Sequence, residues 1–202
     1  TLSPSSAASD VYKRQTTNNI QGEMTFPETR YWIKAPKQPT ARKSDLTLAL
    51  SASMLGLTPA QIMNPPQWMN TGSEQLIVEL RDKESIDNIS IDIALFEQYA
   101  TLYEGRTMIY LWAHDPHSEK NDIYSRFLYL KNGHLDEDSG TGSACANLGG
   151  YQSLQGKHNF TWRLQQGNLI QKESILYLKV AEDHSIWIGG ENRYMGHGQL
   201  YW

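Results

Sequence analysis

DEDSGTGSA, residues 136–144, is a glycine-rich stretch that lies between an expected strand and an expected helix. Thr141 or Ser143 can serve as the N-cap of that helix, because a side-chain oxygen there accepts a hydrogen bond from the first turn. The unpaired N–H groups of the first turn then point outward, with the positive end of the helix dipole behind them. Such a turn binds anions such as carboxylate or phosphate, and its glycines let the backbone approach a ligand closely. Many helices nevertheless begin in this way and bind nothing.

Three familiar glycine motifs do not fit this stretch. A dinucleotide-binding fingerprint needs a third glycine where Cys145 stands, and a phosphate loop needs lysine where Ser143 stands. A hydrolase nucleophile elbow needs glycine two residues before and after the serine, where Thr141 and Cys145 stand. The turn therefore belongs to none of these classes.

Outward from the turn, the sequence predicts many strands and few helices. The alternation from Ile20 to Phe26 and the following residues 31–33 predict a hairpin, and the Pro- and Lys-rich residues 35–43 indicate a connection. Ser44 and Asp92 are expected helix starts, and the first of these helices is expected to end at Gly56. The remaining expected elements are a helix at 141–154 and strands at 68–80 (broken at Thr71-Gly72), 108–112, 123–130, 160–166, 174–180, 185–188 and 193–202. With no regular βαβ alternation, this order predicts an α+β fold whose sheets curl around one or two central helices.

Composition excludes several classes of protein. The chain has 202 residues, of which 39% are hydrophobic, and 18 Lys+Arg against 22 Asp+Glu give a formal charge of -4. Without an excess of positive charge, nucleic acid is not an expected partner. No apolar run of about 18 residues exists, so no membrane span is expected. The single cysteine, Cys145, excludes an internal disulfide and a zinc site built from several thiolates. The expected class is a soluble, cytoplasmic globular protein.

The first residues differ from the rest of the chain. Residues 1–15 read TLSPSSAASDVYKRQ and match neither a signal peptide nor, closely, a mitochondrial presequence. DVYKRQ, residues 10–15, is the translation of GATGTGTATAAGAGACAG, a transposase end used to build sequencing libraries, and no initiator Met precedes it. We therefore expect residues 1–15 to be an adapter-derived segment that does not belong to the fold.

Four segments in order resemble one known family. Ser125-Arg126-Phe127 followed by EDSGTGSA (137–144) resembles the R-[MF]-F … E-D-P-x-T-G-S-A pattern of the PhzF-type phenazine-biosynthesis isomerases, which share the diaminopimelate epimerase fold. The other three are Thr71-Gly72 with LIVEL (76–80), Gln166-Gly167 with Ser174, and IWIGG (186–190) with GHGQL (196–200). The resemblance covers about Asn18 to Trp202. It implies an α+β, diaminopimelate epimerase-like fold, with a curled mixed β-sheet around a central helix in each of two lobes.

The resemblance also implies a reaction and a site. The reaction is a proton shift, without cofactor or metal, in a small carboxylate substrate bound between the two lobes. The N–H groups near Thr141, Gly142 and Ser143 are expected to hold the carboxylate, with Gly140 as a further substrate-binding residue and Glu137 as a weaker neighbour. Asp138 is expected to relay a proton or orient the substrate, and Ser143 to bond the carboxylate. These two are the expected catalytic residues.

The sequence also departs from the family pattern. Ser139 replaces the proline after the E-D pair, and Gln171-Lys172-Glu173 replace G-R-P. Nothing matches the catalytic glutamate and the G-H-A-T-type turn of the first lobe. We therefore expect 16–57 to be a remnant of the N-terminal lobe, 58–190 the C-terminal lobe, and 191–202 a strand that returns to the first lobe. The resemblance is compatible with a homodimer.

Two other functions remain open at this stage. A degenerate relative could bind a small acid without converting it, and the same turn could bind phosphate instead. Cys145 lies three residues after Gly142, which is not the position of the acid–base cysteine of diaminopimelate epimerases, so it is expected to pack in the central helix. His114 and His117 form an H-x-x-H without a third ligand nearby, so no metal site is expected there.

Overall fold

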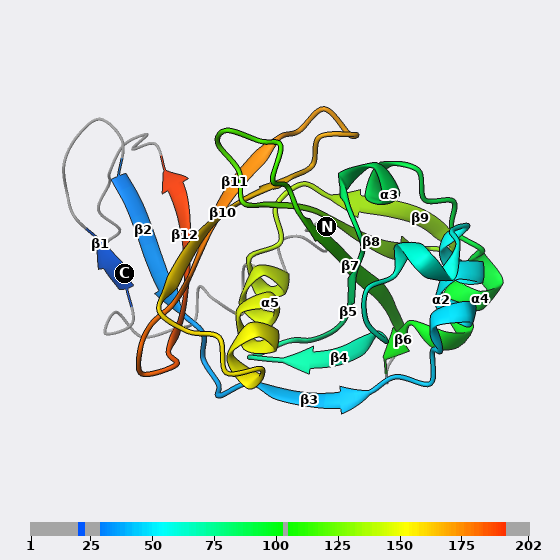
Figure 1. The fold of residues 1–202 in the computed structure, drawn as a ribbon, viewed down its shortest axis with the longest axis horizontal. Coiled ribbons are helices and arrows are strands. Elements are labelled where there is room, and N and C mark those ends of the chain that lie inside the picture. Colours follow the sequence, from blue (N-terminus) through cyan, green and yellow to red (C-terminus); the bar gives the residue numbers. More distant parts are fainter. Residues whose placement is uncertain (1–19, 23–28, 103–104, 193–202) are drawn as a thin grey trace, which may run out of the picture.

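The computed structural model describes residues 20–22, 29–102 and 105–192, and Figure 1 shows their arrangement. One sheet runs through these residues in the order β1-β2-β12-β11-β10-β8-β7-β5-β4-β3, with β6 paired to β7 and β9 paired to β8. Its strands are β1 (Ile20–Gly22), β2 (Thr29–Lys34), β3 (Thr40–Lys43), β4 (Gln67–Asn70), β5 (Glu74–Glu79), β6 (Thr101–Leu102), β7 (Arg106–His114), β8 (Ile123–Lys131), β9 (His134–Asp138), β10 (Phe160–Gln166), β11 (Ser174–Val180) and β12 (Ile186–Asn192). The helices are α2 (Leu48–Leu55), η2 (Pro59–Gln61), α3 (Lys83–Asp87), α4 (Ile93–Tyr99) and α5 (Gly142–Leu154).

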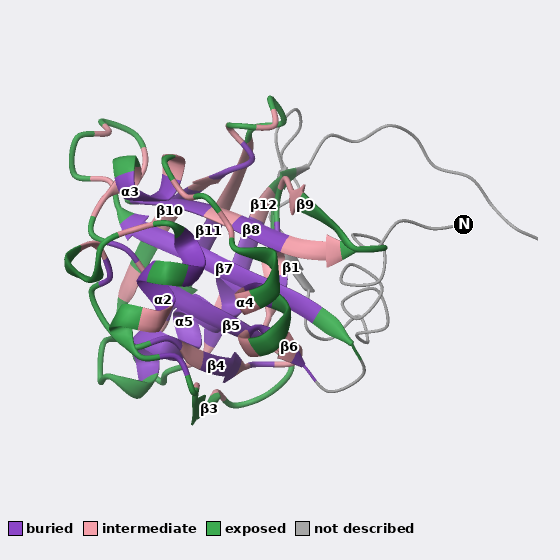
Figure 2. Cartoon of the chain, turned by 90° about the vertical axis from the view of Figure 1, so that its right-hand side faces the viewer, coloured by how far each residue is buried: buried purple, intermediate pink, exposed green. Residues whose placement is uncertain are grey.

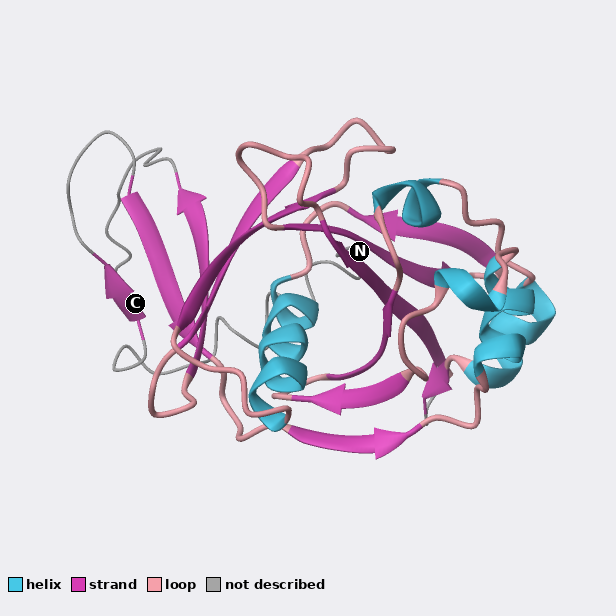
Figure 3. Cartoon of the chain, in the orientation of Figure 1, coloured by secondary structure: helices cyan, strands magenta, loops and turns pink. Residues whose placement is uncertain are grey.

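Helix α5 lies inside the curled sheet, as Figures 1 and 3 show. It contacts β4 and β5 on one side and β11 and β12 on the other. Two adjacent glycines allow this close approach. A Cβ atom on Gly149 would lie 2.7 Å from Leu178 Cδ1, and one on Gly150 would lie 2.8 Å from Thr71 Cγ2. The helix is therefore wedged between the two ends of the sheet, with no space for larger residues at these positions.

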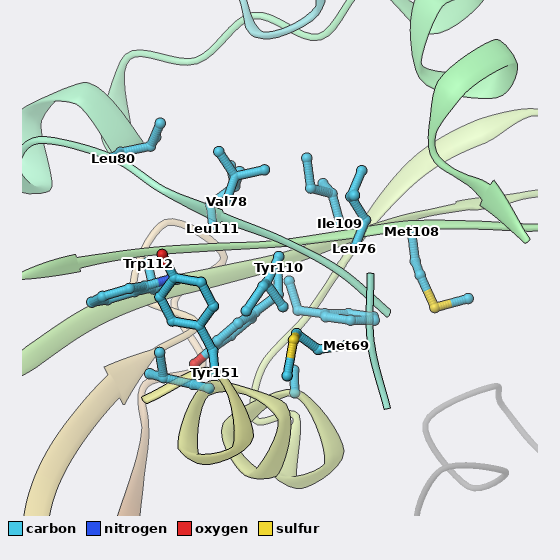
Figure 4. Packing of buried hydrophobic residues seen from close by; sticks show 14 of the residues in the cluster. Met69, Leu76, Val78, Leu80, Met108, Ile109, Tyr110, Leu111, Trp112 and Tyr151 are labelled. Atoms are coloured by element: carbon cyan, nitrogen blue, oxygen red, sulfur yellow. The ribbon is translucent and has the colours of Figure 1, made fainter. Parts of the chain in front are cut away.

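The middle of the sheet is buried on both faces. Figure 4 shows Tyr110 and Trp112 on the side of β7 that faces α5, and Ile109 and Leu111 on the opposite side. Helices α2, α3 and α4 lie over that opposite face, and Figure 2 shows the buried strands behind α2 and α4. The pairs β5–β7 and β8–β10 are parallel, whereas the other pairs in the sheet are antiparallel. Burial on both faces explains why β7 is apolar almost throughout rather than alternating.

The structure confirms several expected elements. The two strands before and after Thr71-Gly72 are β4 and β5. Asp92 is the N-cap of α4, where its side chain accepts from Leu95 N at 3.0 Å. Gly56 ends α2 in the left-handed region, with φ of 67°, which favours glycine. The α+β class, with many strands around a central helix, is confirmed.

Other expectations were wrong in detail. Helix α2 begins after Thr47, whose Oγ1 accepts from Leu50 N at 3.2 Å, whereas Ser44 accepts from Leu46 N before the helix. The expected connection at 35–43 contains β3, an edge strand whose four residues are all exposed and carry no apolar alternation. Leu102 lies in β6 and not on the α4 face. Neither α3 nor β9 was expected.

Some expectations fall outside the described residues. These are the adapter-like residues 1–15, the strand expected at 193–202 and the GHGQL motif at 196–200. The division into lobes at 16–57, 58–190 and 191–202 stays a prediction. None of the helices that the structure describes is long and apolar enough to cross a membrane.

Candidate active site

The glycine-rich turn lies where two strands meet end to end along one edge of β8. In the antiparallel pair β8–β9, Asp138 lies opposite Phe127. In the parallel pair β8–β10, Gln166 lies opposite Ser125. Since Ser125 and Phe127 are two residues apart on β8, the ends of β9 and β10 meet, and the chain leaves β9 there to enter α5. This register brings Asp138, Gln166 and the start of α5 to one place.

The side chain of Gln166 forms hydrogen bonds with residues on both sides of the turn, Asp138 and Thr141. Its Nε2 donates to the main-chain oxygen of Asp138 at 2.7 Å and to Thr141 Oγ1 at 3.0 Å. Its Oε1 accepts from the main-chain N of Thr141 at 3.3 Å. Gln166 is fully buried, so these bonds form away from water. The turn is therefore shaped by the protein itself before any ligand arrives.

Thr141 is the N-cap residue of α5, as expected, but its hydroxyl does not cap the helix. Thr141 Oγ1 instead donates to Asp138 Oδ2 at 2.7 Å. Asp138 is half-buried, and no other group among the described residues contacts its carboxylate by a hydrogen bond. One oxygen of the carboxylate is thus held, and the other remains available to a ligand.

The first turn of α5 presents open N–H groups. The earliest main-chain bonds in the helix run from Ala144 N and Cys145 N to Thr141 O, at 3.1 and 3.0 Å. Within the described parts of the chain, the N–H groups of Gly142 and Ser143 find no acceptor, as expected for the start of a helix. Gly140 is exposed beside them. The turn therefore offers main-chain donors next to the Asp138 carboxylate.

Ser143 lies on the inner side of the turn and is 3% exposed. Its Oγ accepts from Gln75 Nε2 on β5 at 2.8 Å. This bond ties the start of α5 to the β4–β5 hairpin, far away in the sequence.

Glu137 does not join the other expected site residues. Neighbouring residues of a strand point to opposite faces, and Glu137 points away from the side chain of Asp138. Its Oε2 accepts from Arg126 Nε at 3.0 Å and from Arg126 Nη2 at 2.7 Å. Arg126 Nη1 donates to Ile86 O on α3 at 3.1 Å, so the pair joins β8, β9 and α3 behind the turn.

Ser139 and Lys172, which lie at the two departures from the family pattern, both contact Gly167. This glycine has φ of 82°, and a Cβ atom there would lie 2.4 Å from Lys172 O and 2.8 Å from Ser139 O. Ser174 also closes on the turn, because its Oγ is 3.1 Å from where a Cβ on Gly140 would lie. The two altered segments therefore meet beneath the same turn, and two glycines make room for them.

Cys145 and His114 have structural surroundings. Cys145 is fully buried in α5, and this burial raises the pKa of its thiol. His114 packs edge-on against Trp112 and Trp162, with ring centroids 5.6 and 5.1 Å away. The described residues contain no group of three His, Cys, Asp or Glu that could hold a metal ion.

Sequence reasoning singled out five residues that the structure gathers in one turn: Asp138, Gly140, Thr141, Gly142 and Ser143. It gave no role to the residues that support them, which are Gln75, Arg126, Asn147 and Gln166. Gln166 and Arg126 stood in the quoted motifs, so their place in the pattern was a usable signal. Gln75 and Asn147 carried none, because only the folded chain brings Gln75 to Ser143 and Asn147.

Comparisons with known proteins agree with this architecture. The family model of the phenazine biosynthesis-like proteins, PhzC-PhzF, matches residues 9–198. An uncharacterized isomerase of Pasteurella multocida is 36% identical over 157 residues, which is 78% of this chain and 51% of that protein. The chain thus spans about half the length of this relative.

Solved structures show the same fold at 18% sequence identity. The PhzF-family phenazine biosynthesis protein of Bacillus anthracis superposes with a TM-score of 0.67, covering 87% of this chain and 64% of that chain. A protein of Pseudomonas aeruginosa described as a predicted epimerase has a TM-score of 0.55, covering 96% and 73%. The fold is therefore epimerase-like, and the family match over 9–198 shows that this chain belongs to the phenazine biosynthesis-like protein family.

Proposed function

We propose that this chain is an isomerase that shifts a proton within a small carboxylate metabolite without a cofactor. The observation that carries the proposal is a single turn that presents both a half-buried carboxylate, Asp138, and the open N–H groups of Gly142 and Ser143. The first group can exchange a proton, and the second can hold an anion. The isomerase name of the Pasteurella multocida relative supports the same class of reaction.

The N–H groups of the turn bind the substrate carboxylate in this proposal. They stand at the positive end of the α5 dipole, and Gly140 and Gly142 have no side chain to block a ligand. As a proton leaves the carbon beside the carboxylate, negative charge spreads toward the carboxylate oxygens. Donors already fixed by Gln166 and the helix stabilise that charge without having to reorganise.

Asp138 moves the proton. Thr141 Oγ1 holds one carboxylate oxygen at 2.7 Å, which orients the other toward a ligand in the turn. A proton shift needs one group that removes a proton and one that returns it. Asp138 supplies one of them, and the resemblance assigns the other to a first-lobe glutamate for which this chain has no matching motif. We therefore expect the 202-residue chain alone to be inactive or weakly active.

Solvent deuterium exchange tests the proposal. The product of the complete gene is incubated in deuterium oxide with a panel of small carboxylic acids and their amides, and NMR detects deuterium at carbon. We expect exchange in at least one acid and in none of the amides. Asp138→Asn should abolish exchange while the acid still binds, and Ser143→Ala should weaken binding.

Asp136→Asn is the matched control, because Asp136 is exposed and lies two residues earlier on β9. It should leave exchange unchanged. The proposal fails if Asp138→Asn exchanges as fast as the unaltered protein. Binding of inorganic phosphate in preference to every acid would favour the phosphate-binding alternative, and tight acid binding without exchange would favour a binding module. A cytoplasmic location and a homodimer remain predictions from the sequence.

A further inference from the structure

Four buried polar side chains connect the β4–β5 hairpin to the start of α5. Thr71, Gln75, Ser143 and Asn147 are each 3% exposed or less. Asn147 Oδ1 accepts from Thr71 N at 2.9 Å and from Thr71 Oγ1 at 2.8 Å. Asn147 Nδ2 donates to Ser73 O and to Gln75 Oε1, both at 2.8 Å. Gln75 Nε2 donates to Ser143 Oγ at 2.8 Å.

The main chain fixes the direction of every bond in this network. The N–H of Thr71 can only donate, so the Asn147 atom facing it must be the oxygen. The carbonyl of Ser73 can only accept, so the other end of the Asn147 amide must be the nitrogen. That nitrogen also faces Gln75, which must therefore present its oxygen to Asn147 and its nitrogen to Ser143. No amide in the network can be turned around without placing two donors or two acceptors together.

The direction of the network decides how Ser143 can bond. A serine hydroxyl usually rotates and serves as donor or acceptor as required. Here Oγ already accepts from Gln75, so its proton is left to donate. Among the described residues, Ser143 Oγ accepts this one bond and donates none. A buried donor is rarely left unmatched in a folded protein, which indicates that an acceptor arrives from outside this network.

We propose that Gln75 is a positioning residue that commits the Ser143 hydroxyl to donate to the carboxylate of the substrate. This inference rests on the proposed function. The adjoining N–H groups of Gly142 and Ser143 are donors as well, so the three groups that hold the substrate carboxylate in this proposal are all donors, whereas the acceptor of the turn, the Asp138 carboxylate, faces the proton that moves. A carboxylate, which only accepts, satisfies all of them, whereas a neutral amide of the same shape places its NH₂ against at least one donor. Gln75 thus contributes to the selection of acids over amides without touching the substrate.

The substitution Gln75→Glu tests the proposal because it keeps the shape and removes the donor. The ionised carboxyl group still accepts from Asn147, and its second oxygen draws the Ser143 proton toward itself. The affinity of the product of the complete gene for benzoate, measured by calorimetry, should then fall by about tenfold to a hundredfold. It should recover as the pH falls and the introduced carboxyl group becomes protonated, because its O–H then donates to Ser143 as the amide did. The unaltered protein should show no such change while benzoate stays ionised.

Two controls separate positioning from other causes. Gln67→Glu adds the same charge at a half-buried residue of β4 and should leave the affinity for benzoate unchanged. In a Ser143→Ala background, Gln75→Glu should add no pH dependence, because no hydroxyl remains to be turned. If the pH dependence persists there, simple charge repulsion explains it and the proposal is overturned. An affinity of Gln75→Glu equal to that of the unaltered protein at every pH also overturns it.

A second variant covers the case in which Gln75→Glu does not fold. Gln75→Met removes the donor without burying a charge, so the hydroxyl regains its freedom to rotate. The ratio of benzoate to benzamide affinity should fall by about tenfold, with no new pH dependence. An unchanged ratio overturns the positioning role. If the unaltered protein binds no carboxylate at all, the proposed function fails and this inference fails with it. If the unaltered protein binds benzoate and the Gln75 variants bind it equally well, only the role of Gln75 is removed.

Discussion

The side-chain amide of Gln166 donates to the main-chain oxygen of Asp138, with 2.7 Å between Nε2 and O. The same amide accepts from the main-chain N of Thr141 at 3.3 Å, so one side chain spans the turn from its first residue to the helix start. The position of the Asp138 carboxylate therefore depends on β10, a strand that follows it in the sequence by more than twenty residues.

Gln166→Ala should destabilise the protein. It removes the acceptor of the buried Thr141 N–H and one bond to the main-chain oxygen of Asp138, and a buried group left unpaired costs about 1–3 kcal/mol. Urea denaturation monitored by tryptophan fluorescence measures the free energy of unfolding. Gln165→Ala is the control, since the neighbouring side chain is partly exposed and bonds Asn121 and Glu173. Equal effects of the two substitutions would contradict the clamping role of Gln166.

Arg126→Met should be more destabilising than a surface substitution. The side chains of Arg126 and Glu137 are 13% and 5% exposed, so removal of the arginine leaves a nearly buried carboxylate without its cation. Removal of one partner of a buried ion pair costs about 3–5 kcal/mol. The measurement is the free energy of unfolding in urea.

The double variant Arg126→Met/Glu137→Leu separates the pair from the packing around it. Because no charge then remains buried, it should recover much of the stability lost by Arg126→Met alone. If the double variant is less stable than Arg126→Met, Glu137 contributes through contacts other than the pair.

Asp82→Ala should weaken the cap of α3, the helix whose Ile86 carbonyl accepts from Arg126. Asp82 Oδ1 accepts from Ser85 Oγ at 2.7 Å and from Ser85 N at 2.8 Å. These bonds, the side-chain one first, lower the pKa of Asp82 below its ordinary value of 3.8. Loss of such a cap costs about 0.5–2 kcal/mol at pH 7.

The same cap predicts a pH dependence. Since folding lowers the pKa of Asp82, its contribution is complete above about pH 3.8 and is lost as the pH falls through the folded-state value. The difference in unfolding free energy between Asp82→Ala and the unaltered protein should therefore shrink as the pH falls below this range. Asp82→Asn, which keeps an accepting oxygen, should lose less stability at pH 7. A difference that stays constant down to the lowest pH would argue against the cap.

The thiol of Cys145 should be unreactive in the folded protein. It is fully buried, and burial raises its pKa, so both access and the thiolate form are suppressed. Ellman's reagent at pH 8 should detect no thiol before denaturation and one per chain in guanidinium, matching the single cysteine. Rapid reaction of the folded protein would show that α5 opens readily and would undermine its place in the core.

The sequence predicted the α+β class, the central helix and most strands, because these elements have strong local patterns. Strand β9 was missed although Asn132-Gly133 precedes it, a dipeptide that favours two-residue hairpin turns. Both residues have positive φ, 52° and 77°, as such a turn requires. Strand β3 had no detectable pattern, because an exposed edge strand buries no alternate residues. Helix α3 has five residues, too few to show a helical period.

For the candidate site, the sequence predicted the turn but not its support. Asp138 to Ser143 are contiguous, so a motif can reveal them. Gln75 precedes Ser143 by 68 residues, and its bond to Ser143 Oγ depends on how β5 packs against α5. Glu137 stood next to Asp138 in the motif, yet the alternation of a strand turns it to Arg126 on the other face. Adjacency in sequence therefore did not reveal that Glu137 pairs with Arg126, and its part in substrate binding stays a prediction.

Because β9 and β10 both pair with β8, the register on β8 sets the distance between the ends of these two strands. A single residue, Arg126, separates the β8 positions that face Gln166 and Asp138. Removing or adding one residue there would change the span between the two strand ends by about 3.3 Å. The exposed loop around Asn132-Gly133 has no such role and can vary in length without changing that span. We therefore expect insertions and deletions among members of this family to occur in the hairpin loop and not between Ser125 and Phe127.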